Sequence, residues 1–360
     1  MSRPACALVD AAALKHNLQQ VRRRAPRSRV MAVVKANGYG HGLVWVARAL
    51  NGDADAFGVS SAEEGIQLRE AGISQPICLL EGFFTADELP LLSKHHLEPA
   101  IHQDEQLKVL AQALPALKLS VWLKIDTGMH RLGFPPERVP EVVQQLRRSP
   151  SVVNVRLMSH FARADIASDP DTKSQNDSFL ALTRNFGLEA SLANSAGILA
   201  WPQSHLDWVR PGIMLYGVSP LAQQDAVQLD LKPVMTLQTS LIAIHARRKG
   251  EPIGYGGDWR CPQDMPIGVA AIGYGDGYPR HAAPGTPVLV NGSRVSLVSR
   301  VSMDMITLDL RSQPQANLGD PVVLWGQGLP VEVVAKSAGT IAYELLCHVT
   351  ERIPRVPVGR

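Results

Sequence analysis

Lys35 has the residue type and the surroundings for nucleophilic or acid–base chemistry. An apolar run over residues 30–34 ends at this lysine, and a loop with three glycines then precedes a helical pattern that begins at Leu43. A lysine at the carboxyl end of a buried strand has a short tether and poor hydration, which favour its neutral, nucleophilic form. The glycines let the backbone approach a ligand closely, and free N–H groups near a helix start favour an anion. Taken alone, Lys35 is better explained as a surface lysine that closes a strand, and the rest of the chain has to overturn that interpretation.

Polar residues also follow four other predicted strands. They are Lys124 with Asp126, His160, Asn194 with Ser195, and Arg210. Each has a plain structural alternative: a local ion pair, a core imidazole or a helix cap. In a parallel barrel, however, the carboxyl ends of all strands open onto one face, where active sites lie. Polar groups at five strand ends therefore favour one shared site.

The elements that position these residues alternate between strand and helix over the first 230 residues. Strand-like runs cover residues 29–34, 56–59, 76–80, 97–101, 117–125, 152–158, 190–193 and 208–209. Amphipathic helical segments lie between them; Asp10 is expected to cap the first, and Ser61–Glu64 and Thr85–Glu88 have the form of capping boxes. About eight βα units in this length predict an N-terminal (β/α)8 TIM-type barrel within an α/β chain. An open sheet is the alternative, although no G-x-G-x-x-G follows the first strand of the alternating series.

The pattern changes after Lys232-Pro233. Strand-like runs cover residues 234–245, 267–272, 288–290, 295–298, 305–310 and 322–325, with turn signals such as Asn291-Gly292 between them. A helical pair is expected within residues 331–352. We therefore predict two domains: a barrel over residues 1–231, and a mostly β domain over residues 232–360.

Composition excludes several classes of protein. The 360 residues are 45% hydrophobic and 19% charged with a net charge of +3, which does not suggest binding to nucleic acid or to a membrane surface. Four widely separated cysteines predict free thiols in a cytoplasmic protein and no zinc site, and we expect no metal. No signal peptide or apolar membrane-spanning stretch is expected.

Seven segments carry motifs that resemble the alanine racemase family of bacterial enzymes. They are residues 32–42 around Lys35, 124–133, 159–165, 210–217, 254–257, 273–280 and 300–305. The family more often has alanine at the position of Gly38, a difference that removes no catalytic group. The resemblance implies a barrel that binds pyridoxal 5′-phosphate, followed by a β domain. It also implies an isomerase that interconverts L-alanine and D-alanine.

The resemblance further implies a role for each site residue. Lys35 would form the internal aldimine and act on the D face of the substrate, while Tyr255 would act on the L face. A free tyrosine is a poor base at neutral pH, so Tyr255 needs nearby positive charge or hydrogen bonding to its anion. In the family this tyrosine reaches the partner subunit's cofactor, which implies an obligatory homodimer with shared sites.

The remaining implied roles concern cofactor, substrate and entrance. The cofactor would be held by Tyr39, His160, Asn194, Ser195, Arg210, Gly212, Ile213 and Tyr343. The substrate carboxylate would bind Arg131 and the backbone of Met303. Lys124 would be carbamylated, because a carbamate is an anion that orients Arg131 whereas a bare lysine repels it. Asp165, Tyr274, Arg280, Arg300 and Ile341 would line a narrow entrance, although Arg300 and Asp304 would also fit a plain ion pair.

Arg210 is informative because it would face the pyridine nitrogen. A guanidinium does not give up its proton at working pH, so the ring nitrogen stays unprotonated and the ring is a weaker electron sink. Such a sink limits transamination and favours simple proton exchange.

Two alternatives stay open at this point. One is an amino-acid racemase of the same fold with broader specificity, and the other is a non-catalytic pyridoxal-phosphate carrier. The carrier is disfavoured because such proteins usually lack the β domain that holds the second base. The sequence does not separate a biosynthetic role in supplying D-alanine for peptidoglycan from a role in alanine breakdown.

Overall fold

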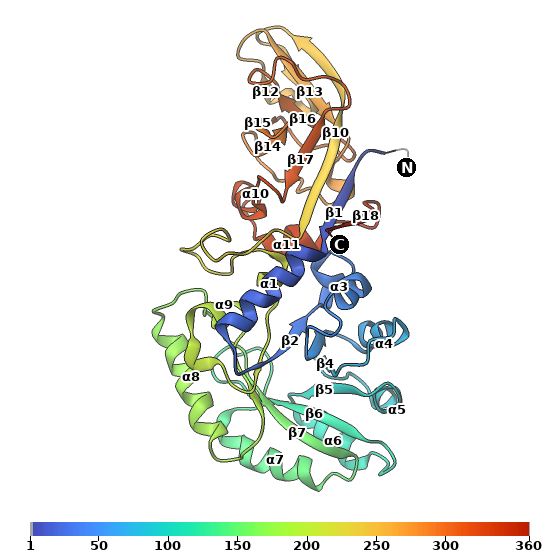
Figure 1. The fold of residues 1–360 in the computed structure, drawn as a ribbon, viewed down its shortest axis with the longest axis vertical. Coiled ribbons are helices and arrows are strands. Elements are labelled where there is room, and N and C mark those ends of the chain that lie inside the picture. The colour runs from blue at the N-terminus through green and yellow to red at the C-terminus, as the bar shows by residue number, and fades with distance from the viewer. Residues whose placement is uncertain (1–2, 360) are drawn as a thin grey trace.

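The computed structural model describes residues 3–359 and shows a closed parallel barrel next to a β sheet domain (Figure 1). The barrel strands are β2 (Arg29–Val33), β3 (Ala56–Val59), β4 (Ile77–Leu79), β5 (Leu97–Ile101), β6 (Leu119–Lys124), β7 (Val152–Met158), β8 (Ala190–Ser191) and β9 (Trp208–Val209). The prediction of a barrel is confirmed, and the open-sheet alternative is wrong because β9 pairs with β2 and closes the ring.

Helical segments connect the strands, and most of them cover the outside of the barrel. They are α1 (Ala11–Arg24), α2 (Lys35–Tyr39), α3 (Leu43–Ala49), α4 (Ala62–Glu70), η1 (Ala86–Glu88), α5 (Leu89–Lys94), α6 (Asp104–Gln112), η2 (Pro136–Arg138), α7 (Val139–Arg148), α8 (Pro170–Thr183), α9 (Ser195–Ala200), η3 (Pro202–Ser204) and η4 (Ile213–Tyr216). The short α2 is instead a turn with left-handed backbone after β2. Asp10 caps α1 by accepting a hydrogen bond from the Ala13 N–H, as predicted. Among the described residues, none of the helices has the length and apolarity needed to cross a membrane.

The amino end of the barrel is filled with large side chains. Trp122 and Trp208 are buried there, and the Arg156 guanidinium lies 2.8 Å from carboxylate oxygens of both Glu98 and Glu189. An isolated charge would be costly in the low dielectric of this core, and the buried guanidinium is accordingly paired with two carboxylates. The barrel is therefore a packed core at this end, and the polar groups at the opposite, carboxyl end are left to form the site.

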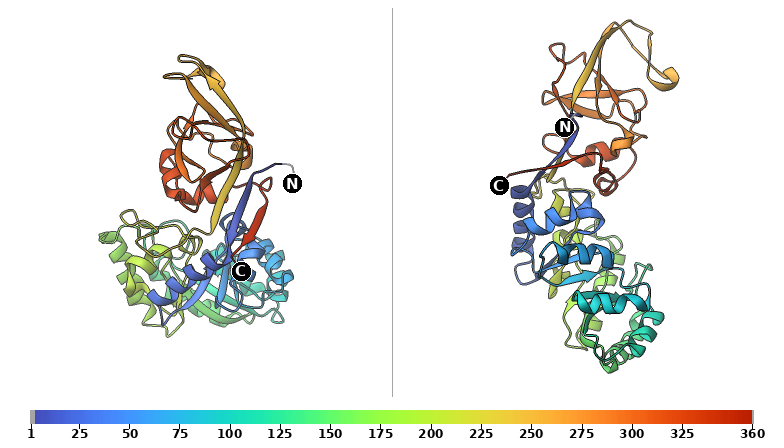
Figure 2. Two further views of the ribbon diagram at one scale, coloured as in Figure 1. Left: turned by 45° about the horizontal axis from the view of Figure 1, so that its top comes forward. Right: turned by 90° about the vertical axis from the view of Figure 1, so that its right-hand side faces the viewer.

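The second sheet has eight strands and includes β1 and β18, the first and last strands of the described chain (Figures 1 and 2). Its order is β13-β16-β15-β14-β17-β10-β1-β18, and the elements of this half are β1 (Cys6–Asp10), β10 (Met235–Arg247), β11 (Pro252–Ile253), η5 (Tyr255–Gly257), β12 (Trp259–Arg260), β13 (Met265–Ala270), η6 (Tyr274–Asp276), β14 (Pro287–Val290), β15 (Ser293–Val298), β16 (Ile306–Asp309), β17 (Pro321–Trp325), α10 (Val331–Ser337), α11 (Ala342–Cys347) and β18 (Arg355–Val358). Strand β1 pairs antiparallel with β10 and parallel with β18.

Two sequence-based expectations need correction. Residues 6–10 do not belong to the barrel: they pair with β10 and β18 and form β1 of the second sheet. The sequence did not indicate this pairing because both partner strands lie more than two hundred residues away in the chain. The capping box at Ser61 is also wrong. The Ser61 side chain makes no cap hydrogen bond, and the Glu64 carboxylate instead accepts from the N–H of Ser60 at 2.9 Å. We keep the division between the domains near residue 232 as a proposal.

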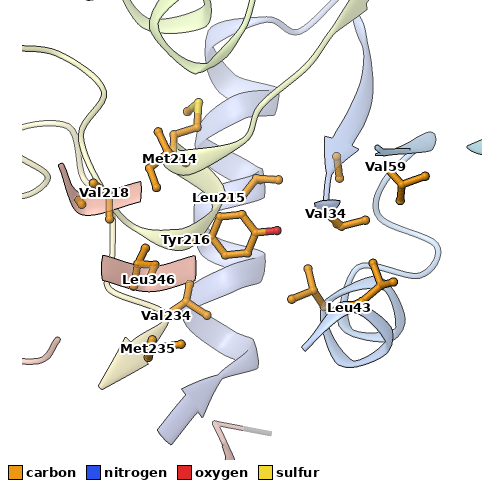
Figure 3. Packing of buried hydrophobic residues seen from close by; sticks show 14 of the residues in the cluster. Val34, Leu43, Val59, Met214, Leu215, Tyr216, Val218, Val234, Met235 and Leu346 are labelled. Carbon is orange, nitrogen blue, oxygen red and sulfur yellow. The ribbon is translucent and has the colours of Figure 1, made fainter. Parts of the chain in front are cut away.

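The two halves share one apolar core where they meet, shown in Figure 3. Tyr216 and Leu215 of η4 contribute from the barrel, and Val234 and Met235 begin the β domain. Leu346 of α11 packs into the same cluster from the last part of the chain. The loop that follows β2 is therefore covered by the C-terminal segment.

Candidate active site

The turn that carries Lys35 has an unusual backbone. Five consecutive residues, Ala36 to Gly40, have positive φ angles between 50° and 78°. Left-handed backbone costs a residue other than glycine about 1–2 kcal/mol, and it normally occurs at single positions. A run of this kind persists only where the surrounding structure holds it.

Contacts from three distant elements hold this turn. The Glu64 carboxylate of α4 accepts a hydrogen bond from the Ala36 N–H at 2.8 Å. Arg355 of β18 donates through Nε to the Gly40 carbonyl at 2.9 Å. Gly40 also has no room for a side chain, since a Cβ there would lie 1.9 Å from the Leu346 carbonyl oxygen. The half-buried Lys35 thus extends from a backbone that is fixed on several sides.

Tyr39, Ser195 and Gly212 form a small polar cradle. A Cβ on Gly212 would lie 2.5 Å from the Tyr39 hydroxyl oxygen, so this position has space only for hydrogen. The Gly212 N–H donates to Ser195 Oγ at 2.9 Å, and Asn194 caps α9 by accepting from the Gly197 N–H. Burial raises the pKa of Tyr39 well above its usual value, so its hydroxyl keeps its proton and acts as a donor.

Arg210 and His160, which follow β9 and β7, are in contact. The Arg210 guanidinium is buried and lies 3.3 Å from His160 Nδ1, which therefore accepts the hydrogen bond. It also donates to Ser191 Oγ and to the Ser159 carbonyl, both at 2.6 Å. Burial lowers the pKa of Arg210 to about 10, which leaves it charged at neutral pH.

Four cations gather at this end of the barrel: Lys35, Lys124, Arg131 and Arg210. Burial, followed by the charges of the other three cations, lowers the pKa of Lys124 to about 8. Burial and all four charges lower the pKa of His160 well below its usual value, so the ring is neutral. Apart from burial, positive charges are the main cause of both shifts. Such a cluster calls for bound anions.

The predicted entrance residues divide into two groups. Asp165 lies close enough to Tyr343 of α11 for its charge to add to burial in raising the pKa of the phenol to about 12. Met303 and Tyr274 lie together, since the Met303 and Ser302 carbonyls accept from the N–H groups of Gly275 and Tyr274.

The other entrance residues lie on the surface of the β domain side. Arg300 pairs with Asp258, so the pair with Asp304 considered above is wrong; Asp304 pairs instead with Arg352 at 2.5 Å. Ile341 is 61% exposed, and Arg280 is also exposed.

Tyr255 lies away from the rest of the site within one chain. It begins η5 between β11 and β12, a hairpin at the end of the β domain farthest from the barrel (Figure 1). Its side chain is 67% exposed. The hairpin itself is well held, because Ser299 donates to the Ile253 carbonyl at 2.6 Å and a Cβ on Gly254 would strike Ser299 Oγ.

Sequence reasoning did not find several residues that shape the site. They are Glu64, His41, Ser191, Tyr216 and Arg355. Only His41 and Glu64 gave a signal in the sequence, as a histidine and a carboxylate that follow predicted strands. Arg355 had none, because only the pairing of β18 with β1 brings it to the Lys35 turn.

The closed barrel, the lysine after its first strand and the attached β sheet are typical of a TIM-type barrel enzyme, a class in which active sites lie at the carboxyl ends of the strands. Residues 9–220 match the family model for the alanine racemase N-terminal domain, and residues 234–357 match that for the C-terminal domain. The chain therefore belongs to the alanine racemase family and is an isomerase of that family.

Individual relatives match this chain over nearly their whole length. The chain is 56% identical to the alanine racemase of Nitrosococcus oceani over 97% of this chain and 98% of that protein. It is 52% identical to the alanine racemase of Vibrio cholerae, over 97% of both. The crystal structure of the biosynthetic alanine racemase from Pseudomonas aeruginosa superposes with a TM-score of 0.96 at 47% identity, covering 99% of both chains.

Proposed function

We propose that this chain interconverts L-alanine and D-alanine with pyridoxal 5′-phosphate. The observation that carries the proposal is a half-buried lysine surrounded by three further cations, beside a cradle of hydroxyl and N–H donors. This donor set fits a cofactor with an aldehyde, a phosphate and a phenolic oxygen. When bound, the cofactor supplies the electron sink that makes the α-proton of an attached amino acid removable.

The residues that fit the phosphate are those of the cradle. The hydroxyl groups of Tyr39, Ser195 and Tyr343 would donate to it, together with the N–H of Ile213. Gly212 would leave the space for the phosphate, since a Cβ there would meet the Tyr39 hydroxyl and its own N–H already donates to Ser195 Oγ. Asn194 supports Ser195 by fixing the start of α9. Hydrogen bonds to an anion are roughly twice as strong as those between neutral groups, so this small set suffices for binding.

Arg210 and His160 would set the electronic character of the cofactor ring. Arg210 keeps its proton at neutral pH, and its hydrogen bonds to Ser191 and Ser159 fix the direction of its remaining donors. His160 is neutral and fixed by Arg210, so it would pack on the ring without adding charge. This arrangement favours proton exchange over transamination.

Arg131 and the Met303 N–H would bind the substrate carboxylate. Lys124 would carry a carbamate, because its lowered pKa supplies the neutral amine that reacts with carbon dioxide. The carbamate would replace a cation among cations by an anion and orient Arg131. Labelled bicarbonate should give a 13C carbamate signal that Lys124→Met abolishes; active protein without that signal would refute the modification.

Racemisation requires a group on each face of the α-carbon. Lys35 would hold or release the proton on the D face. Within one chain Tyr255 belongs to the β11–β12 hairpin, whereas Lys35 follows barrel strand β2, and the exposed, well-anchored hairpin supports delivery of Tyr255 to a second copy. We therefore propose a homodimer in which each site combines Lys35 of one subunit with the Tyr255 side chain contributed by the other.

We expect the entrance to admit only a small substrate. Tyr274, Tyr343, Ile341, Asp165, Arg280 and Arg300 would narrow the approach, which favours alanine over the broader specificity considered as the alternative. Equal turnover of lysine or arginine would support the alternative instead. The proposed reaction would serve either role, the supply of D-alanine for peptidoglycan or the breakdown of alanine.

One complementation experiment tests both the chemistry and the shared site. Lys35→Ala and Tyr255→Phe should each lack alanine racemisation, while Tyr255→Phe keeps a visible cofactor band that borohydride fixes to Lys35. Mixing the two inactive proteins under conditions of subunit exchange should restore about a quarter of the wild-type activity, since about half the dimers are mixed and each has one intact site. No recovery despite proven exchange would refute the shared site. Absence of a band in the wild type would refute the whole proposal.

A further inference from the structure

His41 is fully buried directly after the left-handed turn, and nothing in the proposed mechanism uses it. Its Nδ1 lies 2.8 Å from the Tyr39 carbonyl oxygen and 3.2 Å from that of Gly38. Because a carbonyl only accepts, Nδ1 carries the proton. The other nitrogen, Nε2, has no hydrogen-bond partner among the described residues. The histidine is therefore a neutral, single donor aimed at the backbone of Tyr39.

The environment keeps the ring neutral. Burial lowers the pKa of His41 to about 4, and the charge of Arg355 acts in the same direction against the two backbone hydrogen bonds. A neutral ring with one nitrogen unpartnered is not a proton carrier at working pH. Its contribution has to come from its donor and from its packing.

Packing connects His41 to Tyr39 through Tyr216. The Tyr216 ring stacks on Tyr39 with centroids 4.6 Å apart, and the His41 ring lies 4.7 Å from the Tyr216 ring. The Tyr216 hydroxyl donates to the Val33 carbonyl at 3.0 Å, two residues before Lys35. Figure 3 shows the Tyr216 ring next to Leu215, with its hydroxyl directed toward Val34 and β2. Tyr216 is thus fixed to the strand that presents Lys35.

Tyr39 needs this support because its backbone is strained. Its φ is 50°, in a region of backbone conformation that bulky residues rarely occupy. Its hydroxyl oxygen also reaches Gly212, where it lies 2.5 Å from the position that a Cβ would take. Rotation of the Tyr39 peptide toward a relaxed conformation would move the hydroxyl away from the cradle. The hydrogen bond from His41 opposes that rotation.

We propose that His41 is a positioning residue whose Nδ1–H bond to the Tyr39 carbonyl fixes the Tyr39 hydroxyl as a phosphate donor. This inference rests on the proposed function. It says that recognition of the cofactor phosphate depends on a residue that does not itself touch the cofactor. It distinguishes two roles that a buried histidine can have. A packing residue would support the whole site, whereas this positioning residue would affect recognition of the phosphate alone.

The test compares binding of pyridoxal 5′-phosphate and of pyridoxal, which lacks the phosphate, to protein freed of cofactor. His41→Phe keeps an aromatic ring beside Tyr216 but removes the donor. It should weaken binding of pyridoxal 5′-phosphate by about tenfold, the equivalent of one hydrogen bond, and leave pyridoxal binding unchanged. His41→Asn keeps an amide donor two bonds from Cβ, where Nδ1 stands, and should retain most of the preference for the phosphate.

The matched control is His205→Phe, because His205 Nε2 also meets a backbone carbonyl, that of Ile198 at 3.0 Å, away from the Lys35 turn. It should leave both affinities unchanged. Equal loss of both ligands in His41→Phe, or no loss of either, would overturn the proposal. If His41→Phe does not fold, loss of the phosphate preference in a folded His41→Asn would overturn it. Failure of the wild-type protein to bind pyridoxal 5′-phosphate would instead refute the proposed function.

Discussion

Replacement of Gly212 by alanine tests the geometry of the phosphate cradle directly. The new Cβ would lie 2.5 Å from the Tyr39 hydroxyl oxygen and 3.2 Å from Cζ. The first contact is roughly 1 Å inside an ordinary van der Waals separation, while the second needs only a small adjustment. The Tyr39 ring cannot retreat easily, because Tyr216 stacks against it at 4.6 Å. The clash therefore acts mainly on one oxygen atom.

The size of the effect follows from this contact. Overpacking of a filled site costs about 1–3 kcal/mol, which is roughly 5- to 150-fold in a dissociation constant if it is relieved by displacing the hydroxyl. Tyr39→Phe alone should cost about 1.5–3 kcal/mol, because it removes a hydrogen bond to a charged group. In the double variant the alanine no longer meets the hydroxyl, so binding should be about as weak as in Tyr39→Phe alone.

The assay is a double-mutant cycle on the dissociation constant of pyridoxal 5′-phosphate, followed by the absorbance of the bound cofactor. The four proteins are wild type, Gly212→Ala, Tyr39→Phe and the double variant. Strong non-additivity would establish that Gly212 is needed for the Tyr39 hydroxyl. Costs that add within about 0.5 kcal/mol would refute the reasoning, since the two sites would then act independently.

Three further outcomes are expected. Arg210→Gln should raise the pyruvate formed per racemisation event, measured with lactate dehydrogenase, because a neutral amide no longer keeps the ring nitrogen unprotonated; an unchanged ratio would contradict this role. Burial, Arg210 and Arg131 lower the pKa of Lys124 from 10.5 in the unfolded chain to about 8 in the folded chain, so between these pH values the unfolded chain binds one more proton. In cofactor-free protein without bicarbonate, the unfolding free energy of the wild type relative to Lys124→Met should therefore rise between about pH 8 and pH 10.5. A difference in urea denaturation that does not change with pH would refute the lowered pKa. Glu64→Gln should weaken the hydrogen bond from the Ala36 N–H and lower the rate of borohydride trapping at Lys35. The same change at the exposed Glu63 should leave that rate unchanged. Equal effects of the two substitutions would show that the Glu64 contact is unimportant.

Local patterns predicted the barrel well because each strand is an apolar run bounded by turn residues. Strands β7 and β9 begin and end where the sequence indicated. The Asn291-Gly292 turn is also confirmed, with both residues at positive φ between β14 and β15. Polar residues at strand ends were found by the same reasoning, since parallel topology brings those ends together.

Other features depend on contacts that no local pattern contains. The left-handed run includes Ala36 and Tyr39, residue types that carry no signal for positive φ. The turn is held by Glu64 and Arg355 from elsewhere in the chain. Tyr216 reads as an ordinary core aromatic until its stack is seen. The place of Tyr255 depends on a second chain, so one sequence predicts it through resemblance alone.

The position of β1 also determines how the molecule can be divided. This strand lies between β10 and β18 and is the partner that holds β18 in the sheet. A single cut near residue 232 would therefore leave each fragment incomplete: the first would carry an orphan strand, and the second would expose the edge of β10 and release β18. Since Arg355 of β18 also holds Gly40, the loss would extend to the Lys35 turn. A β domain able to fold alone would need residues 5–10 attached to it by a new linker, and an exchange of domains between relatives would have to move the first strand and the last together.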